Sequence, residues 1–517
     1  MRAGTESMRS VGTGSLSRNT LLNVGTQVYS VIVAFAALPF IIRGLGADGF
    51  GLLTLLWAFV GYFSVVDFGA GQAALRFLSI GAARHDIDHV VQTIAVTVLV
   101  SLTVGLASGA IVLGVSFTDV GGVFGTGAAS SLDMASGLRL LAIALPAQVL
   151  QVSLKSVPMA FNKFGFNAVL QLLSATVQWG GGALIATLGG GFMGVLLLTV
   201  ISRYVSVFGY IASVLWLVPE IRHGRRRVTR EALRPFVSFS GWAMVPQLLG
   251  PMLTFVERFI VGSVLSLAWV SYFSVPADTV SRFLVFPLSL GAAASPVFSS
   301  NWTDATGREK VKRVYGRSTK LVLLGILPLS LVLGIFARGI FSAWLGPDFA
   351  ERSSLPLLIM AGGMVFNVLA QIPASFLPAV GRPDLPAKLA LVQVPLYCGA
   401  LVFCTAQWGI VGTAAAWAVK VSTEMWALGW LVRRTTGSTG SVFQGSMLLF
   451  LGLAAPTALV LVLVRSAIPS LLWAAPVIAL VLGLYAVAAW RWSMTADDRQ
   501  VILDNLRPIF GVRIHGA

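Results

Sequence analysis

The chain has 517 residues, of which 56% are apolar and only 11% are charged, whereas soluble domains carry about 25% charged residues. Because one membrane span takes about 20 apolar residues, this content suffices for about 14 spans and leaves no sizeable water-soluble domain. The composition therefore excludes a soluble enzyme, and two cysteines in one apolar segment, Cys398 and Cys404, exclude a disulfide framework or a cysteine-based metal cluster.

Charge-poor apolar stretches follow one another along the whole chain. They are apolar on all sides and lack the polar and apolar alternation of a membrane strand, so we expect helices. The predicted spans lie near 20–45, 50–75, 90–117, 137–157, 165–188, 192–218 and 236–264, and then near 267–298, 319–344, 354–378, 388–406, 409–432, 446–464 and 470–490.

The basic residues predict the orientation of these spans. With an even number of spans both termini share one side, and that side holds 27 Lys and Arg residues against 5 on the other. The positive-inside rule therefore puts both termini in the cytoplasm. The run Arg225–Arg227 is expected to anchor this topology and to contact anionic lipid headgroups. The net charge of +16 is thus explained by topology, and we expect no nucleic-acid partner.

The two halves of the chain carry an internal repeat. Residues recur in the same order at an offset of 218 to 220, and six spans, being an even number, keep the same orientation in both copies. We therefore expect two bundles related by a pseudo-twofold axis along the membrane normal, with a cleft between them, as in transporters. The matching positions are Gln151 with Gln371, Pro158 with Pro378, Leu45 with Leu265, and Gly191 and Gly194 with Gly409 and Gly412.

The predicted fold is an all-α, polytopic membrane protein of about 14 transmembrane helices, with two six-helix bundles and two additional C-terminal helices. The tail beyond Thr495 is either a short interfacial helix or a frayed polar segment. The predicted parts are an N-terminal cytoplasmic tail (1–19), the first bundle (20–218), a basic cytoplasmic linker (219–235), the second bundle (236–432), helices 13 and 14 (445–490) and a cytoplasmic tail (491–517).

Eight charged residues fall inside predicted spans, where a charge at mid-bilayer costs about 2.5 to 3.5 kcal/mol and therefore calls for a partner, a water-filled cavity or a function. Arg203, Asp278 and Lys420 lie 10 or 11 residues beyond the outer start of their spans, and so close to the midplane. Asp278 with Arg282, and Lys420 with Glu424, are spaced i,i+4, so each pair can neutralise itself on one helix face.

The other charged residues in spans have no such local partner. Glu257 and Arg258 are adjacent and point about 100° apart, so they face different neighbours. Asp67 and Arg203 have no oppositely charged residue one turn away. Under the repeat offset, Arg203 falls one position from Lys420, so both halves offer a cation at the same depth.

Cations at mid-depth, together with amide side chains on several spans, suit an anion that carries many hydroxyl groups. Arginine offers a planar fork to phosphate oxygens, and amides bind sugar hydroxyls, although amides also serve helix packing. A buried carboxylate can carry a coupling proton or sodium ion. The amides are Gln148, Gln151, Gln171, Gln178, Gln247, Asn367, Gln371 and Gln393. The candidates for substrate binding are Arg203, Arg258, Arg282 and Lys420, and those for ion coupling are Asp67, Glu257, Asp278 and Glu424.

Several kinds of catalytic or cofactor site have no signature in the sequence. It has no Gly-x-x-x-x-Gly-Lys-Ser/Thr phosphate loop, and its four histidines form no metal-ligand pattern. The predicted outer loops are short, whereas a membrane glycosyltransferase or polymerase should present a larger one. We expect a transporter that is not an enzyme and uses no metal or cofactor. A membrane glycosyltransferase or a non-transporting assembly partner is the alternative from another class.

Five segments resemble one known family. The segments 38–52 (LPFIIRGLGADGFGL) and 61–69 (GYFSVVDFG) resemble the opening of Wzx-type polysaccharide flippases, which belong to the multidrug/oligosaccharidyl-lipid/polysaccharide (MOP) exporter superfamily. The segments 257–262 (ERFIVG) and 270–276 (VSYFSVP) resemble the seventh and eighth spans of that family, and 378–382 (PAVGR) resembles a segment of its second half.

This resemblance implies two six-helix bundles that flip an undecaprenyl-diphosphate-linked oligosaccharide across the bacterial cytoplasmic membrane by alternating access. It also implies coupling to H+ or Na+, with the polysaccharide polymerase machinery as a candidate partner. Glu257 stands where the family more usually has Asp. Two relatives stay as alternatives. A lipid II flippase would line its first half with several arginines, and a drug/cation antiporter would have an acid-lined cleft.

Overall fold

The computed structural model describes most of the chain, and every regular element in the described part is a helix. The predicted all-α class is therefore confirmed. Asp67 and the basic run Arg225–Arg227 lie outside the described residues. The described residues are 13–65, 69–118, 122, 124, 128–222, 228–300, 302, 305–436, 441–468, 470–496 and 498–500.

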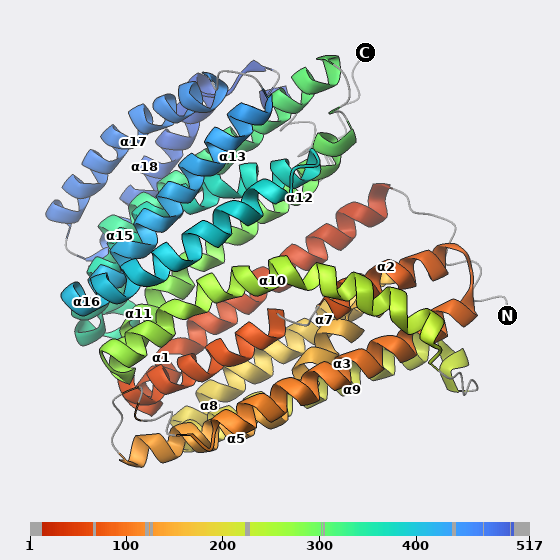
Figure 1. Ribbon diagram of the computed structural model, residues 1–517. Coiled ribbons are helices and arrows are strands. Elements are labelled where there is room, and N and C mark those ends of the chain that lie inside the picture. Colours follow the sequence, from red (N-terminus) through yellow and green to blue (C-terminus); the bar gives the residue numbers. More distant parts are fainter. Residues whose placement is uncertain are drawn as a thin grey trace. The chain divides into compact units, whose positions relative to one another are not determined.

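The chain divides into two compact units, Met1–Ser271 and Tyr272–Ala517. Within the first unit, α3, α5 and α9 pack side by side (Figure 1). Its helices are α1 (Thr13–Val65), α2 (Ala70–Ala83), α3 (Ile87–Val115), α5 (Ala128–Leu154), α6 (Ser156–Ala160), α7 (Phe164–Ala175), the π-helix η2 (Thr176–Gly181), α8 (Gly182–Thr187), α9 (Gly191–Leu217), the 3-10 helix η3 (Pro219–Arg222) and α10 (Arg230–Val264).

The boundary between the units falls inside α11 (Leu267–Ser281). In the second unit, α15 packs against both α13 and α16. The helices of this unit that follow α11 are the 3-10 helix η4 (Arg282–Leu284), α12 (Val285–Ser300), α13 (Ala305–Ile335), α14 (Ala337–Leu345), α15 (Pro347–Ala379), α16 (Asp384–Thr436), α17 (Ser441–Ala467) and α18 (Leu471–Trp492).

Nine helical segments of the described chain are long and apolar enough to cross a membrane. The two longest helices are broken: α1 has a non-helical residue at Gly46 (φ 71°), and α16 has one at Gly409 (φ 59°). Glycine is the residue that adopts such positive φ values readily, so each break is encoded locally. Both helices therefore run as two segments joined at a sharp turn. The count of 14 spans stays a prediction.

The same backbone breaks recur in both halves of the chain. Gly191, at the start of α9, and Gly409, inside α16, both have positive φ and lie 218 residues apart. Asn162 and Gly381, each in a turn after a proline-containing helix, also have positive φ and lie 219 residues apart. The offset read from the sequence therefore reappears in the backbone geometry, which supports the internal repeat.

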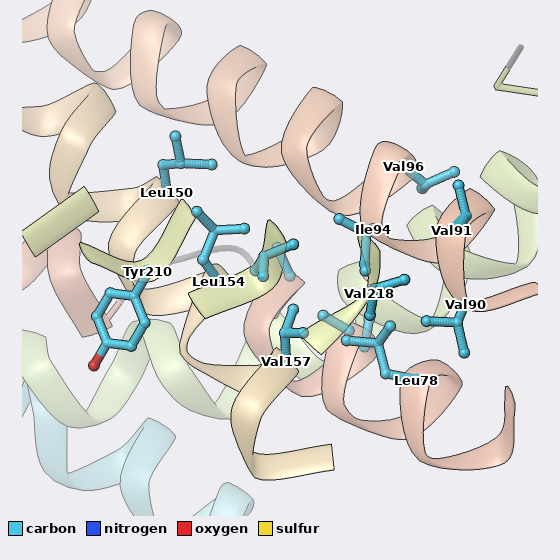
Figure 2. Close-up of a cluster of buried hydrophobic side chains, with 14 of the residues drawn as sticks. Leu78, Val90, Val91, Ile94, Val96, Leu150, Leu154, Val157, Tyr210 and Val218 are labelled. Carbon is cyan, nitrogen blue, oxygen red and sulfur yellow. The ribbon is translucent and has the colours of Figure 1, made fainter. Parts of the chain in front are cut away.

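A cluster of buried apolar side chains packs several helices of the first unit against one another. Leu78 of α2 packs with Val90 of α3, Val157 of α6, Val218 after α9 and Phe236 of α10 in one cluster, of which Figure 2 shows most members. Helix α2 begins immediately after Gly69, whose backbone is in the left-handed region, and is thus a separate helix. The apolar core therefore fixes α2 against helices from four other parts of the unit.

The last two helices belong to the second unit. Leu461 and Val464 of α17 and Ala474 and Ile478 of α18 form a buried cluster with Phe336, which lies between α13 and α14. In the same region Arg465 donates a hydrogen bond of 2.7 Å to the carbonyl oxygen of Ile335, at the end of α13. This bond satisfies one of the carbonyls that a helix end leaves unpaired.

The segment after α18 is held by a charged network. The Asp498 carboxylate accepts hydrogen bonds from Nε of Arg317 at 2.8 Å and from Nζ of Lys320 at 2.9 Å, both on α13. It also accepts from the backbone amide of Thr495, whose hydroxyl accepts from the Asp498 amide in return. These bonds hold the pKa of Asp498 well below its usual range, against the opposing effect of burial. The described part of the tail is thus docked on its own unit.

Candidate functional site

The structure places seven of the eight predicted charged residues on helices, and Asp67 lies outside the described residues. They are shared between the two compact units. Arg203 lies on α9 and Glu257 and Arg258 on α10, all in the first unit; Asp278 lies on α11, Arg282 opens η4, and Lys420 and Glu424 lie on α16, all in the second unit.

Lys420 and Glu424 form an ion pair along α16. Nζ of Lys420 lies 2.7 Å from Oε2 of Glu424, and the two side chains are 15% and 26% exposed. The i,i+4 pairing expected from the spacing is therefore confirmed. Because the pair is largely shielded, the attraction between the charges is stronger than it would be in water. The cation of the second half is thus neutralised within its own helix.

Arg203 has a different environment at the corresponding place in the first half. Its Nη2 donates to Oε1 of Gln178 at 3.2 Å, and its Nε is buried without a hydrogen-bond partner among the described residues. No carboxylate among the residues that the structure describes forms an ion pair with Arg203. Arg203 lies twelve residues into α9, about 18 Å along the helix and so near mid-depth. The first half thus holds a cation that a neutral amide contacts.

Gln178 lies in the π-helix η2, which interrupts the helical segment 164–187. A π-helix inserts one extra residue per turn, and such insertions are frequent at functional sites. The turn carries the sequence Thr176-Val-Gln178-Trp179-Gly-Gly181 and has contacts with α1, α7, α8 and α9. The irregular turn therefore presents polar and aromatic side chains to two neighbouring helices.

Aromatic side chains of α1 contact the π-helix η2. The rings of Trp57 and Trp179 lie 5.1 Å apart between centroids at 73°, an edge-to-face contact, and the Trp57 indole N–H is buried without a partner in the described chain. The hydroxyls of Tyr29 and Thr176 are hydrogen-bonded at 2.8 Å. We call these residues the η2 cluster: Tyr29, Trp57, Thr176, Gln178, Trp179 and Arg203.

Only Arg203 and Gln178 of this cluster were candidates from the sequence. The aromatic members were missed because a tryptophan in an apolar span is ordinary packing material, and the π-helix changes which residues share a face. One signal was present: three consecutive glycines, 180 to 182, follow Trp179 in the middle of a span. Glycines there weaken a regular α-helix, which favours a local irregularity.

The adjacent charges of α10 lie among aromatic rings. Glu257 is buried, with 4% of its surface exposed. The Arg258 guanidinium carbon lies 5.9 Å from the ring centroid of Phe255, within cation–π range. Near them, Phe259 makes an edge-to-face contact with Phe59 of α1 at 4.6 Å. The two charges thus lie where α10 packs on α1.

Asp278 and Arg282 flank a change of helix type. Helix α11 ends at Ser281, and Arg282 is the first residue of the 3-10 helix η4. Three of the four steps between Asp278 and Arg282 are α-helical, and both side chains are half-buried. The pairing expected from their i,i+4 spacing stays a prediction.

The predicted amides divide between packing and unpaired groups. Gln371 donates to the carbonyl of Asn367, one turn earlier on α15, at 3.3 Å, which fits helix packing. On α5, the side-chain oxygens of Gln148 and Gln151 are buried without a hydrogen-bond partner among the described residues. Gln247 lies on α10, in a stretch whose side chains are outside the described part.

Known proteins resemble this chain over most of its length. Residues 16–302 match the family described as "Polysaccharide biosynthesis protein", and residues 243–398 match the MatE family. The chain is 25% identical over 425 residues to the "Putative O-antigen transporter" of Shigella flexneri, covering 81% of this chain and 98% of that protein. It is 21% identical over 410 residues to the "Probable low-salt glycan biosynthesis flippase Agl15" of Haloferax volcanii, covering 79% and 82%.

A solved structure has the same fold. The lipid II flippase MurJ in an inward closed conformation matches with a TM-score of 0.69 and 14% identity, covering 92% of this chain and 98% of that one. The apolar helices and the flippase relatives identify a multi-pass membrane protein. The two family matches and the O-antigen transporter relative confirm the resemblance to polysaccharide flippases of the MOP superfamily. Because the first family match spans more than half of the residues, the chain belongs to the polysaccharide biosynthesis protein family.

Proposed function

We propose that the chain flips a lipid-linked oligosaccharide, carried on a polyprenyl diphosphate such as undecaprenyl diphosphate, across the membrane by alternating access. Its family and two relatives named for O-antigen transport and glycan flipping support this substrate class. The chemistry needs no enzymatic step, because the lipid crosses from one leaflet to the other unchanged. The two bundles at 20–218 and 236–432 would move, joined by the linker at 219–235.

The observation that carries the proposal is the environment of Arg203. A charge at mid-bilayer is costly, and an amide cannot neutralise it. An anionic cargo would compensate this charge during each passage, and a guanidinium offers two parallel N–H groups to a phosphate or carboxylate. In the second half Lys420 is already compensated by Glu424. The first half is therefore the stronger candidate for the contact with the anion.

The other charged residues receive supporting roles in this proposal. Arg258 and Arg282, and Lys420 when its ion pair opens, are further candidates for contact with the diphosphate or with acidic sugars. Glu257 is a candidate for coupling to H+ or Na+, because its carboxylate is buried within the membrane region. The remaining coupling candidates are Asp67, Asp278 and Glu424.

The placement in the cell follows from the charge distribution. We place the chain in the bacterial cytoplasmic membrane with both termini in the cytoplasm, as the excess of basic residues on that side favours. The segments 1–19 and 491–517 are then cytoplasmic tails, and helices 13 and 14 occupy 445–490. The basic run Arg225–Arg227 would contact anionic lipid headgroups, and polymerase machinery would meet the cargo on the outer side.

Leaflet-resolved translocation tests this function. The purified chain is placed in proteoliposomes of verified orientation with a fluorescent polyprenyl-diphosphate glycan, and accessible label is measured with and without proton or sodium gradients. We expect translocation that falls at least tenfold in Arg203→Ala, while Arg139→Ala, an exposed arginine on α5, keeps the wild-type rate. Absence of translocation under every gradient would contradict the proposal.

Lipid II is the second candidate cargo, because the MurJ fold covers nearly the whole chain. The same vesicles loaded with fluorescent lipid II decide between the two cargoes. We expect the lipid-linked oligosaccharide to be translocated at least tenfold faster than lipid II. Faster translocation of lipid II would assign the chain to peptidoglycan precursors.

A further inference from the structure

We propose that the η2 cluster is a binding site for a pyranose ring of the transported glycan, with Trp57 and Arg203 as its hydrogen-bond donors. This inference rests on the proposed function and names the part of the cargo that the first unit recognises. All six residues of the cluster belong to that unit, on α1, η2 or α9.

Two buried donors of the η2 cluster have no acceptor among the described residues. The indole N–H of Trp57 and the Nε–H of Arg203 are both buried without a partner among the described residues. A buried donor without an acceptor costs roughly 1 to 3 kcal/mol, and more for a charged group, so a protein retains it where another state supplies the acceptor. Both unpaired groups are N–H donors, so a partner that satisfies them must supply acceptor atoms such as hydroxyl oxygens.

Aromatic side chains lie beside these donors. Trp57 and Trp179 contact each other edge to face, and both side chains are half-buried. A pyranose has an apolar face of C–H bonds and a rim of hydroxyl oxygens, so it can stack on an indole and accept hydrogen bonds at its edge. Binding sites for small molecules combine aromatic walls with a few placed polar groups in this way. A bare diphosphate would use the arginine but not the indoles.

The irregular helix η2 orients two side chains of the cluster. The π-helical turn directs Gln178 to Arg203 while the next residue, Trp179, meets Trp57. An α-helical turn without the inserted residue would rotate these two side chains relative to α1 and α9. The Gln178 amide also leaves the Arg203 charge uncompensated, so that acidic groups of the glycan would be favoured. The unpaired donors, the aromatic rings and the uncompensated arginine together fit a site that binds a sugar next to an anionic group.

Binding of two matched probes tests the site. The full chain in nanodiscs is titrated with a short-chain polyprenyl diphosphate carrying one N-acetylhexosamine, and with the same lipid diphosphate lacking the sugar. We expect the wild type to prefer the sugar-bearing probe. Trp57→Phe keeps an aromatic ring and removes the N–H, so it should reduce that preference by about fivefold to tenfold, equivalent to one hydrogen bond. Binding of the sugar-free probe should not change.

A matched control and an internal ratio make the test decisive. Trp216→Phe, an exposed tryptophan on α9 that packs on Phe166, should leave both affinities unchanged. A misfolded variant would lose both probes together, which the ratio reveals. Equal loss for both probes in folded Trp57→Phe, an unchanged ratio, or a wild type that ignores the sugar would overturn the site.

The same samples separate this inference from the function on which it rests. If the wild type shows the sugar preference but translocates no glycan in proteoliposomes, the flippase proposal fails and the binding site stands. If translocation proceeds and Trp57→Phe keeps the full preference, the site fails and the flippase proposal stands.

Discussion

The two halves of the chain hold a cation at nearly the same position of the repeat and treat it in opposite ways. In the first half Arg203 is contacted by the neutral amide of Gln178, and in the second half Lys420 pairs with the carboxylate of Glu424. Depth and charge are therefore similar at the two positions, and the compensation by neighbouring side chains differs. In the function proposed above, this compensation decides whether a cation remains available to cargo.

The helices that carry these cations differ as well. The first half contacts its cation through a π-helical turn, whereas the second half places cation and anion on one continuous α-helical face after the break at Gly409. In the second half, the cation and its partner lie one turn apart on the same helix. The first arrangement depends on two separate helices, so movement of either helix changes the environment of Arg203.

Converting the first half to the electrostatics of the second should have the largest effect. Gln178→Glu places a carboxylate where Arg203 now meets an amide, so the guanidinium would be neutralised by the protein. We expect glycan translocation to fall at least tenfold while the folded yield stays at the wild-type level. Proteoliposome transport measures this. Gln178→Leu adds no charge and should cost less than threefold. Equal losses in both variants would show that compensation is not the cause.

Removing the counter-charge in the second half should destabilise the fold. Glu424→Gln leaves the shielded Lys420 ammonium without its partner, which we expect to cost about 2 kcal/mol and to lower the melting temperature in detergent. Lys420→Met with Glu424→Met removes both charges and should restore most of the loss. A double variant as unstable as the single one would mean that packing, not charge, sets the cost.

A β-carbon at the break in α1 should strain the backbone. Gly46 has φ 71° and ψ 174°, a region that is essentially restricted to glycine. Gly46→Ala should therefore cost about 1 to 2 kcal/mol by thermal unfolding. Gly452→Ala, in open space on helix α17, should be neutral or slightly stabilising. An unchanged melting temperature in Gly46→Ala would contradict the encoded turn.

The smallest expected effect concerns the docked tail. Asp498 has a depressed pKa in the folded chain, so its stabilising contribution is present above its ordinary pKa of about 4 and fades as the pH falls further. Asp498→Asn should cost about 1 kcal/mol at pH 7, and its difference from the wild type should shrink below about pH 4. Melting curves across pH measure this, with the exposed Glu309→Gln as the control. A pH-independent difference would exclude the carboxylate as its source.

The fold was predictable because its main determinants are local. Apolar runs of span length and Gly or Pro boundaries suffice for an all-helical membrane protein, and the 218-residue offset from Gly191 to Gly409 reappears as two matched positive-φ turns. The tight turn at Gly46, which joins two predicted spans, lies where those spans were separated. Helix α13 begins at Ala305, well before its predicted span at 319. The ion pairs of its Arg317 and Lys320 with Asp498 were not predictable either, because the partners lie about 180 residues apart in the sequence.

The candidate site was only partly predictable. Spacing alone suffices for the Lys420–Glu424 pair, because i,i+4 neighbours meet on any regular α-helix. The partner of Arg203 lies 25 positions away on an irregular helix, and the Trp57–Trp179 contact joins segments more than 120 residues apart. Pairings of that kind depend on tertiary packing, which periodicity does not specify.

In the proposed function, the uncompensated cation of the first half contacts the anionic cargo. The most direct measurement is the affinity of the nanodisc-embedded chain for a short-chain polyprenyl diphosphate in three variants: Arg203→Ala, Arg203→Lys and the Lys420→Met/Glu424→Met double. We expect at least a tenfold loss for Arg203→Ala, a partial loss for Arg203→Lys and a loss of less than about threefold for the double variant, because Lys420 is already compensated by Glu424. Wild-type affinity in Arg203→Ala together with a tenfold loss in the double variant would contradict this assignment.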